Sequence, residues 1–280
     1  MSIRILTDST ADLAPEMIRR YNIKIQPLYV NFGPETVVDG ELTQAAFLEK
    51  IRQSQEFPKT SHPSPADFVR TFRELLATGD EIIYIGLSSA ISGTMSSAAL
   101  ALNELGDVPV SLVNSRNLSM GIGLLVLHAA AMAEAGKSRQ EIVAELERLV
   151  PKVRTAFIVD TLDFLHKGGR LSAIGAFVGN ILNIHPLVAM VDGRLTILEK
   201  VRGRRDRALQ RLLDWALADP NKIRPEWVSV THVACPDDAQ KLMTTLREQN
   251  SLLNLVTTEA GAVITSHCGP NTIGILFIEK

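Results

Sequence analysis

The sequence has few cysteines, few aromatic residues and no excess of positive charge. Its 280 residues include two cysteines, Cys235 and Cys268, which do not form a CxxC pair. This spacing supports neither a disulfide framework nor a zinc site. Aromatic residues make up 5% of the chain and the formal net charge is -2, which argues against a nucleic acid partner. We therefore expect no metal or cofactor, no nucleic acid, and a reducing, cytoplasmic compartment.

Long apolar runs are also missing. The longest, from Gly121 to Ala135, contains His128 and Glu134 and is shorter than the ~20 residues of a membrane-spanning helix. The first residues, Met1 to Leu6, lack the length and the cleavage site of a signal peptide. Apolar residues nevertheless make up 46% of the chain, which is ordinary for a globular protein of one or two domains.

The order of the predicted elements divides the chain into two parts. Apolar strands alternate with helices in the first part, which predicts a parallel sheet covered on both faces. In the second part, Asp192-Gly193 between two strands predicts a β-hairpin. We therefore expect an α/β protein. Residues 1–153 form a three-layer α/β/α domain with a parallel sheet, and residues 154–280 form an α+β domain with a mixed or antiparallel sheet.

The individual elements follow from apolar runs, capping residues and turn residues. Strands are predicted over residues 3–6, 25–30, 82–87, 108–113, 154–159, 186–191, 195–201, 227–233, 253–259 and 273–278. Helices are predicted over residues 15–21, 43–53, 65–76, 94–105, 162–182, 204–218 and 237–249, and a long one begins at residue 120.

A hydroxyl-rich turn between a predicted strand and a predicted helix is the most informative segment. Ser88 to Thr94 follows strand 82–87 and opens helix 94–105. Free N–H groups and the helix dipole favour an anion at such a point. Ser92 adds a hydroxyl donor, and Gly93 allows close approach. The same residues also suit an ordinary helix cap, so this segment alone leaves both interpretations open.

Other segments carry similar chemistry. Thr60 and Ser61 lie in a hydroxyl-rich turn before a predicted helix, and His267 lies between hydroxyl residues and a Gly-Pro turn. Asp8 and its neighbours end the first strand, where open α/β sheets place ligand contacts. Each also has a structural interpretation, as a turn former, a buried histidine or a helix cap. The basic turn from Lys167 to Arg170 equally fits a solvated loop.

A serine hydrolase is an alternative that the residues leave open. Ser92 could act with His267 and either Asp8 or Asp160, but the nucleophile-elbow pattern fails because Ala90 stands where a glycine is needed. No dinucleotide or P-loop fingerprint is complete. A scaffold without a ligand, in which the hydroxyl turns only cap helices, is a further alternative.

Taken together and in order, these segments resemble the DegV family of bacterial proteins, along essentially the whole chain. The matching stretches are residues 7–13, 59–65, 88–94, 159–162, 165–171, 182–186 and 267–270. The chain departs from the usual pattern at His62, where the family often has Gln, and at Met95-Ser96, where Tyr-Gln is common.

The resemblance implies a fatty-acid binding protein and not an enzyme. Family members of the FakB type hold a long-chain fatty acid in a tunnel with its carboxylate at a polar mouth between the two domains. A separate fatty acid kinase then phosphorylates the bound carboxylate to an acyl phosphate, in the service of phospholipid synthesis. This role leaves room for transient contact with a membrane surface.

The expected site residues follow from this resemblance and from hydrogen-bonding chemistry. The expected carboxylate-binding residues are Thr60, Ser61, Ser92, Gly93, Thr94 and His267. Lys167, Arg170 and Arg202 are expected to face the kinase or to contact an anion, so Arg170→Ala should impair phosphorylation more than binding. A protonated His267 would form a charge-assisted bond. Candidates for the tail tunnel are Leu28, Phe32, Ile91, Met95, Met120, Phe157, Phe164, Ile184 and Ile264.

Overall fold

The computed structural model describes residues 2–54, 56–170, 184–251 and 253–280. Its strands are β1 Ile3–Asp8, β2 Lys24–Gln26, β3 Tyr29–Phe32, β4 Glu35–Val38, β5 Lys59–Ser61, β6 Glu81–Gly86, β7 Val110–Asn114, β8 Val153–Ile158, β9 Ile184–Val191, β10 Arg194–Arg202, β11 Ile223–His232, β12 Leu255–Glu259 and β13 Ile273–Glu279. Its α-helices are α1 Pro15–Arg20, α2 Gln44–Gln53, α3 Pro65–Leu76, α4 Thr94–Leu105, α5 Met120–Glu134, α6 Arg139–Leu149, α7 Asp163–Lys167, α8 Arg205–Ala216, α9 Pro236–Gln249 and α10 Ala262–Cys268.

The first part of the chain forms a parallel sheet in the order β2-β1-β6-β7. Side chains of β6 alternate between its two faces, as the pleat of a strand requires. Ile82 and Tyr84 pack with residues of α3 and α4, whereas Ile83 and Ile85 pack with residues of α5 and α6. This confirms the predicted parallel sheet with helices on both faces.

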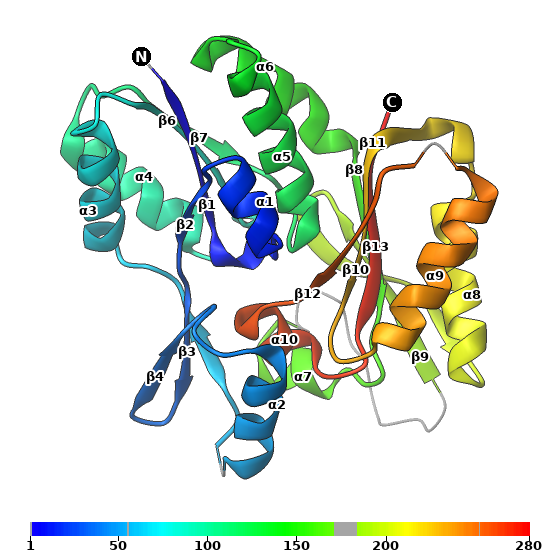
Figure 1. The fold of residues 1–280 in the computed structure, drawn as a ribbon. Coiled ribbons are helices and arrows are strands. Elements are labelled where there is room, and N and C mark those ends of the chain that lie inside the picture. Colours follow the sequence, from blue (N-terminus) through cyan, green and yellow to red (C-terminus); the bar gives the residue numbers. More distant parts are fainter. Residues whose placement is uncertain (1, 55, 171–183, 252) are drawn as a thin grey trace.

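The second part forms a six-stranded mixed sheet in the order β10-β9-β8-β13-β11-β12. Helices α8 and α9 cover one face of this sheet (Figure 1). The predicted hairpin is present between β9 and β10, with Asp192 and Gly193 both at positive φ. The predicted mixed sheet, and with it the α/β fold class, is confirmed.

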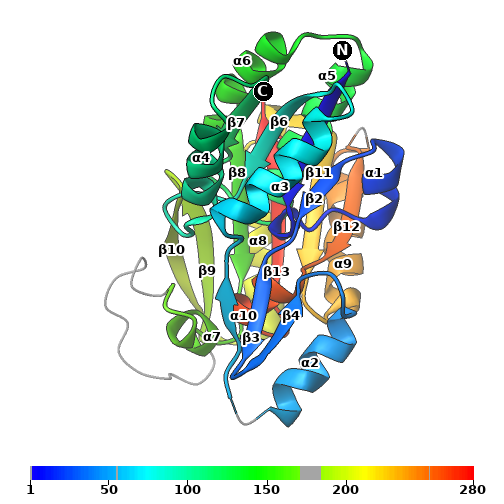
Figure 2. The same ribbon diagram turned by 90° about the vertical axis from the view of Figure 1, so that its left-hand side faces the viewer.

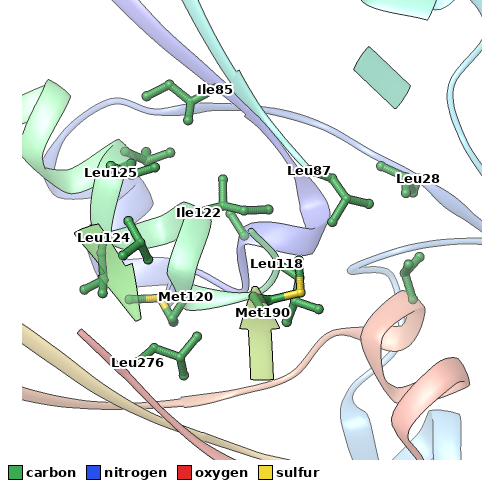
Figure 3. Packing of buried hydrophobic residues seen from close by; sticks show 14 of the residues in the cluster. Leu28, Ile85, Leu87, Leu118, Met120, Ile122, Leu124, Leu125, Met190 and Leu276 are labelled. Atoms are coloured by element: carbon green, nitrogen blue, oxygen red, sulfur yellow. The ribbon is translucent and has the colours of Figure 1, made fainter. Parts of the chain in front are cut away.

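Helix α5 lies between the two sheets (Figure 1) and joins them into one core. The surface of α5 has no polar stripe, because the helix is buried on nearly all sides. Figure 3 shows Met120 and Leu124 of α5 among side chains that include Ile85 of β6 and Leu276 of β13. Because α5 packs against both sheets, the domain boundary at residues 153 and 154 stays a prediction.

A third, antiparallel sheet was not predicted from the sequence. The predicted strand 25–30 is in fact two strands, β2 in the parallel sheet and β3 in a small sheet of order β4-β3-β5. Pro27 lies between them, and a proline has no N–H to continue a ladder. Figure 2 shows β3 and β4 below the parallel sheet, near α10. This small sheet places β5, with Thr60 and Ser61, beside the last helix.

The ends of several helices agree with their capping residues. Helix α4 has the predicted bounds, and Ser64 and Ser138 form capping boxes at the starts of α3 and α6. The predicted turn at Thr60 and Ser61 is wrong, because both lie in strand β5. His267 lies in α10, a helix that was not predicted, and the Gly-Pro turn expected after it is present. The predicted helix 162–182 begins as α7, and its residues 171–182 lie outside the described residues. Within the described ranges, every helix is too short or too polar to cross a membrane.

Candidate ligand-binding site

A cavity of about 620 Å³, measured with the solvent at its mouth, lies where the two parts of the chain meet. Its polar lining residues are Thr60, Ser61, His62, Ser92, Arg170 and His267. Its apolar lining residues are Leu28, Leu87, Ile91, Leu118, Phe157, Leu165, Leu195, Val263, Ile264 and Cys268. The cavity therefore combines a polar group of side chains with a larger apolar wall, which is the usual composition of a small-molecule site.

Separate elements carry the polar side chains of this cavity. Strand β5 carries Thr60 and Ser61, the turn before α4 carries Ser92, and α10 carries His267. At the cavity, the two parts of the chain are joined by the hydrogen bond of 2.8 Å between Thr60 Oγ1 and His267 Nε2. The structure thus brings together four of the six predicted carboxylate-binding residues in one cavity lining.

His267 is neutral in the ligand-free protein. Burial, and then the charge of Arg170, lower the pKa of its imidazole to about 4. The protonated form that the sequence analysis considered is therefore disfavoured at neutral pH. Its Nδ1 atom is buried without a partner among the described residues. A Cβ at Gly168 would lie 2.3 Å from this Nδ1, so only glycine leaves room for the ring there.

The turn before α4 has free hydrogen-bonding capacity. Ser92 Oγ lies 2.8 Å from Thr94 Oγ1 and accepts a hydrogen bond of 3.3 Å from the Thr94 N–H. The Gly93 N–H donates to no group of the described residues. A Cβ at Gly93 would lie 2.6 Å from Nε2 of His62. Ser92 lines the cavity, whereas Gly93 and Thr94 are not among its lining residues. One turn therefore contains both a helix cap, made by Ser92 and Thr94, and the unpaired N–H of Gly93.

Arg170 lines the cavity with a half-buried guanidinium group. It donates a hydrogen bond of 2.9 Å to the Gly168 carbonyl, and no carboxylate of the described residues pairs with it. Burial lowers the pKa of this guanidinium, although an arginine stays charged. A fixed positive charge without an acidic partner therefore lies in the same lining as Ser92 and His267.

The other two predicted basic residues do not line the cavity. Lys167, at the end of α7, is exposed and places its Nζ 5.4 Å from the centre of the Phe57 ring. Arg202 is exposed at the end of β10. The structure therefore separates Arg170, which lines the cavity, from Lys167 and Arg202, which lie on the surface.

A second cavity, the distal cavity, lies beside the first and encloses about 340 Å³, measured in the same way with the solvent at its mouth. The two share the lining residues Leu118, Phe157, Ile264 and Cys268. The second cavity reaches the face of the six-stranded sheet, where Thr155, Thr231 and Gly274 leave more space than large apolar side chains would. The distal cavity therefore adjoins the first on the side of the six-stranded sheet.

The nine predicted tunnel residues divide between lining and core. Leu28, Ile91, Phe157 and Ile264 line the cavities. The other five pack elsewhere: Phe32 against Phe47, Met95 with the cluster behind β6, Met120 in the central core, Phe164 against Phe57, and Ile184 at the start of β9. Sequence reasoning missed Leu87, Leu118, Val263 and Cys268, whose apolar character does not distinguish lining from core.

The catalytic triad of the hydrolase alternative is not assembled. His267 pairs with Thr60, and its Nδ1 has no carboxylate partner in the described structure. Asp8 instead accepts hydrogen bonds from Thr10, Tyr84 and Leu87, and Asp160 pairs with Arg205. A triad needs the carboxylate on the histidine, so these residues do not support acyl hydrolysis.

Comparison with known proteins gives consistent results. The family described as "Uncharacterised protein, DegV family" matches residues 2–280. A fatty-acid binding DegV family protein from Thermus thermophilus is 33% identical, with a TM-score of 0.92 and 100% of each chain covered. DegV of Bacillus subtilis, a fatty acid binding protein, is 32% identical, with a TM-score of 0.87 and 100% of each chain covered.

A more distant similarity is to the fatty acid kinase B3 protein of Streptococcus pneumoniae, solved with linoleic acid. It is 21% identical, with a TM-score of 0.84 and 100% of each chain covered, which shows the shared fold alone. The family match over nearly the full length does not depend on that similarity. This chain belongs to the DegV family.

Proposed function

We propose that this protein binds a long-chain fatty acid, with the carboxylate at the polar mouth and the tail in the two adjoining cavities. The observation that carries the proposal is the mouth itself, where the Arg170 guanidinium has no carboxylate partner among the described residues and lies in one lining with the hydroxyls of Thr60, Ser61 and Ser92. Burying a carboxylate without donors costs several kcal/mol, so such a group of donors suits an acid head group. The fatty acids of the Thermus and Bacillus relatives agree with this chemistry.

Each polar residue has a proposed role. Ser92 donates its hydroxyl to one carboxylate oxygen, and the Gly93 and Thr94 N–H groups add partial positive charge behind it. Thr60 and Ser61 donate from β5, and Arg170 supplies the charge. His267 acts through Thr60: with the proton on Nε2 it donates to Thr60 Oγ1, which leaves the Thr60 hydroxyl free to donate to the carboxylate. Lys167 and Arg202 stay outside this contact and are proposed to face the kinase.

We further propose that the bound acid is presented to a separate kinase. In that step a carboxylate oxygen forms a bond to the terminal phosphorus of a nucleoside triphosphate. The bond from that phosphorus to the leaving nucleoside diphosphate breaks at the same centre. No nucleotide fingerprint is complete in this sequence, so the nucleotide belongs to the partner.

Mass spectrometry under native conditions tests the binding proposal. A co-purifying mass of a long-chain fatty acid, and saturable binding of added fatty acid after delipidation, are the expected results. Ser92→Ala should weaken binding by roughly fivefold to tenfold, because one hydrogen bond to the carboxylate is lost. Ser96→Ala, an exposed serine in the same helix, is the matched control.

Three outcomes separate the alternatives. If no fatty acid co-purifies and none binds when it is added, a scaffold without a ligand would be favoured. Steady hydrolysis of an acyl ester that Ser92→Ala abolishes would favour the hydrolase. Transfer of labelled phosphate to the bound acid when a fatty acid kinase and ATP are added supports presentation, and its failure with a kinase active on another carrier would contradict it.

A further inference from the structure

Two buried carboxylates from the first part of the chain hold the start of α10. Asp39 Oδ1 accepts hydrogen bonds from the N–H groups of Ala262 at 2.7 Å and Val263 at 3.3 Å. Asp12 Oδ1 accepts one from the N–H of Gly261 at 2.8 Å. These bonds supply acceptors for N–H groups that the first turn of a helix leaves free.

This arrangement is costly for a helix cap. Burial raises the pKa of Asp12 to about 8 and raises that of Asp39 as well. Asp39 Oδ2 is buried without a partner in the described structure. The exposed capping boxes at Ser64 and Ser138 satisfy helix starts without burying a carboxyl group. The first turn of α10 is therefore fixed more firmly than capping alone requires.

Both carboxylates converge on the residue that precedes α10. A Cβ at Gly261 would lie 3.0 Å from Asp39 Oδ1 and 3.3 Å from Asp12 Oδ1, which is tighter than ordinary contact. Ser119, which lines the distal cavity, donates a hydrogen bond of 2.5 Å to Asp12 Oδ2. The position of this turn is thus set by several contacts at once.

Helix α10 depends on such contacts because it is short. A helix of seven residues is not stable alone, so its position comes from its neighbours. It supplies Val263, Ile264, His267 and Cys268 to the cavity lining. At its other end, His267 is joined to Thr60 of β5. Both ends of α10 are therefore fixed by residues from the first part of the chain.

We infer that Asp39, supported by Asp12, is a positioning residue for carboxylate recognition, because it holds α10 where His267 faces the cavity. This inference rests on the proposed function. Asp39 itself does not line the cavity, and its effect on the ligand passes through His267. His267 lies roughly 7.5 Å along the helix axis from Ala262, which is a short distance for a rigid helix. A shift of the first turn therefore displaces the imidazole by about as much as the turn itself moves.

Comparing a fatty acid with its methyl ester tests this role. Asp39→Ala should weaken binding of the acid by roughly fivefold to tenfold, whereas the ester, which has no anionic head group, should lose much less. Asp39→Asn keeps an oxygen that can accept from the N–H groups of Ala262 and Val263, so it should retain most of the acid binding. Asp12→Ala, which removes the acceptor of the Gly261 N–H, serves if Asp39→Ala fails to fold. In a His267→Gln background the Asp39 substitution should have little further effect on the acid.

Ser138→Ala is the matched control, since it removes a helix cap on α6, away from the cavity. It should lower the free energy of unfolding without changing the preference for acid over ester. Equal losses for acid and ester, or additive effects of the Asp39 and His267 substitutions, would overturn the inference. If the unmodified protein binds no fatty acid, the proposed function fails instead.

Discussion

The polar mouth and the distal end of the cavity both contain hydroxyl and imidazole side chains, yet of the two only the mouth contains a charged side chain. At the distal end, Thr155 donates to Asn117, Thr231 pairs with Thr258, and Thr272 donates to a backbone carbonyl. Each end has an imidazole with a buried nitrogen that lacks a partner among the described residues, His232 at the distal end and His267 at the mouth. The mouth adds Arg170, a positive charge without an acidic partner in the described structure. An unpaired charge, more than polarity, therefore distinguishes the mouth from the distal end.

The difference has an energetic reason. A buried polar group without a partner costs about 1–3 kcal/mol, and a ligand that supplies the partner recovers this cost. The distal hydroxyls are paired within the protein, which leaves them compatible with an alkyl tail. Burial lowers the pKa of the imidazole at both ends, that of His267 to about 4, so the charge of Arg170 is what makes the mouth the end suited to an anion.

The largest expected effect is on stability in acid, through His267. Its folded-state pKa of about 4 lies below the ~6.5 of an unfolded histidine, so the unfolded chain takes up the proton first. As the pH falls from about 6.5 to about 4, the folded protein should lose stability of the order of 3 kcal/mol relative to His267→Gln. Denaturant unfolding of both proteins across this range measures the difference.

The comparison with His267→Gln is needed because other groups titrate in the opposite sense. The pKa values of Asp8, Asp12 and Asp39 are raised by burial, so these residues favour the folded state as the pH falls. Their contributions to the pH dependence of stability are the same in both proteins and cancel in the difference. A bound fatty acid should reduce the difference, since its carboxylate stabilises the protonated imidazole. Identical pH profiles for the two ligand-free proteins would show that the mouth carries no such cost.

The next effect is on affinity, through Arg170. Arg170→Ala should weaken fatty-acid binding by roughly tenfold to a hundredfold, because the carboxylate loses a charge-assisted contact. This changes the expectation from the sequence that phosphorylation would suffer more than binding, since the structure places the guanidinium in the cavity lining. Calorimetric titration with a fatty acid and with its methyl ester measures the effect.

Lys167→Ala is the control for Arg170, because it removes an exposed positive charge from the same turn without changing the cavity lining. The acid should bind this variant nearly as well as the unmodified protein. If both variants lose affinity equally, general electrostatic attraction would explain the binding, and the mouth would have no special role.

The sequence was informative where local rules decide the structure. The bounds of α4, the capping boxes at Ser64 and Ser138, and the Asp192-Gly193 turn follow from residues close together in the chain. The position of β5 beside α10 does not, because it depends on contacts between residues about 200 positions apart. The resemblance of the separate motifs supplied the idea of a shared site, which periodicity alone could not give.

The same distinction explains the residues that were missed. Asp12 lies in a recognised motif, but its contact with Gly261 joins residues 249 positions apart. Arg170 was expected to face the kinase or to contact an anion, and only the folded chain shows that its guanidinium lies in the cavity lining. The cavity lining and the core use the same apolar residue types, so the sequence does not distinguish them. Leu118 lines the cavity and Met120 lies in the core, although they are two positions apart.

The smallest expected effect is at the distal end, where a change should affect stability but not recognition. Thr155→Val keeps the shape of the side chain but leaves the buried Asn117 Oδ1 without the Thr155 hydroxyl. The free energy of unfolding should fall by about 1–2 kcal/mol, while the preference for acid over ester stays unchanged. Ser92→Ala at the mouth should show the reverse pattern, with a larger loss of acid binding than of stability. If Thr155→Val instead reduced the preference for acid, the distal end would also take part in recognition, and the charge of Arg170 would no longer separate the two ends of the cavity.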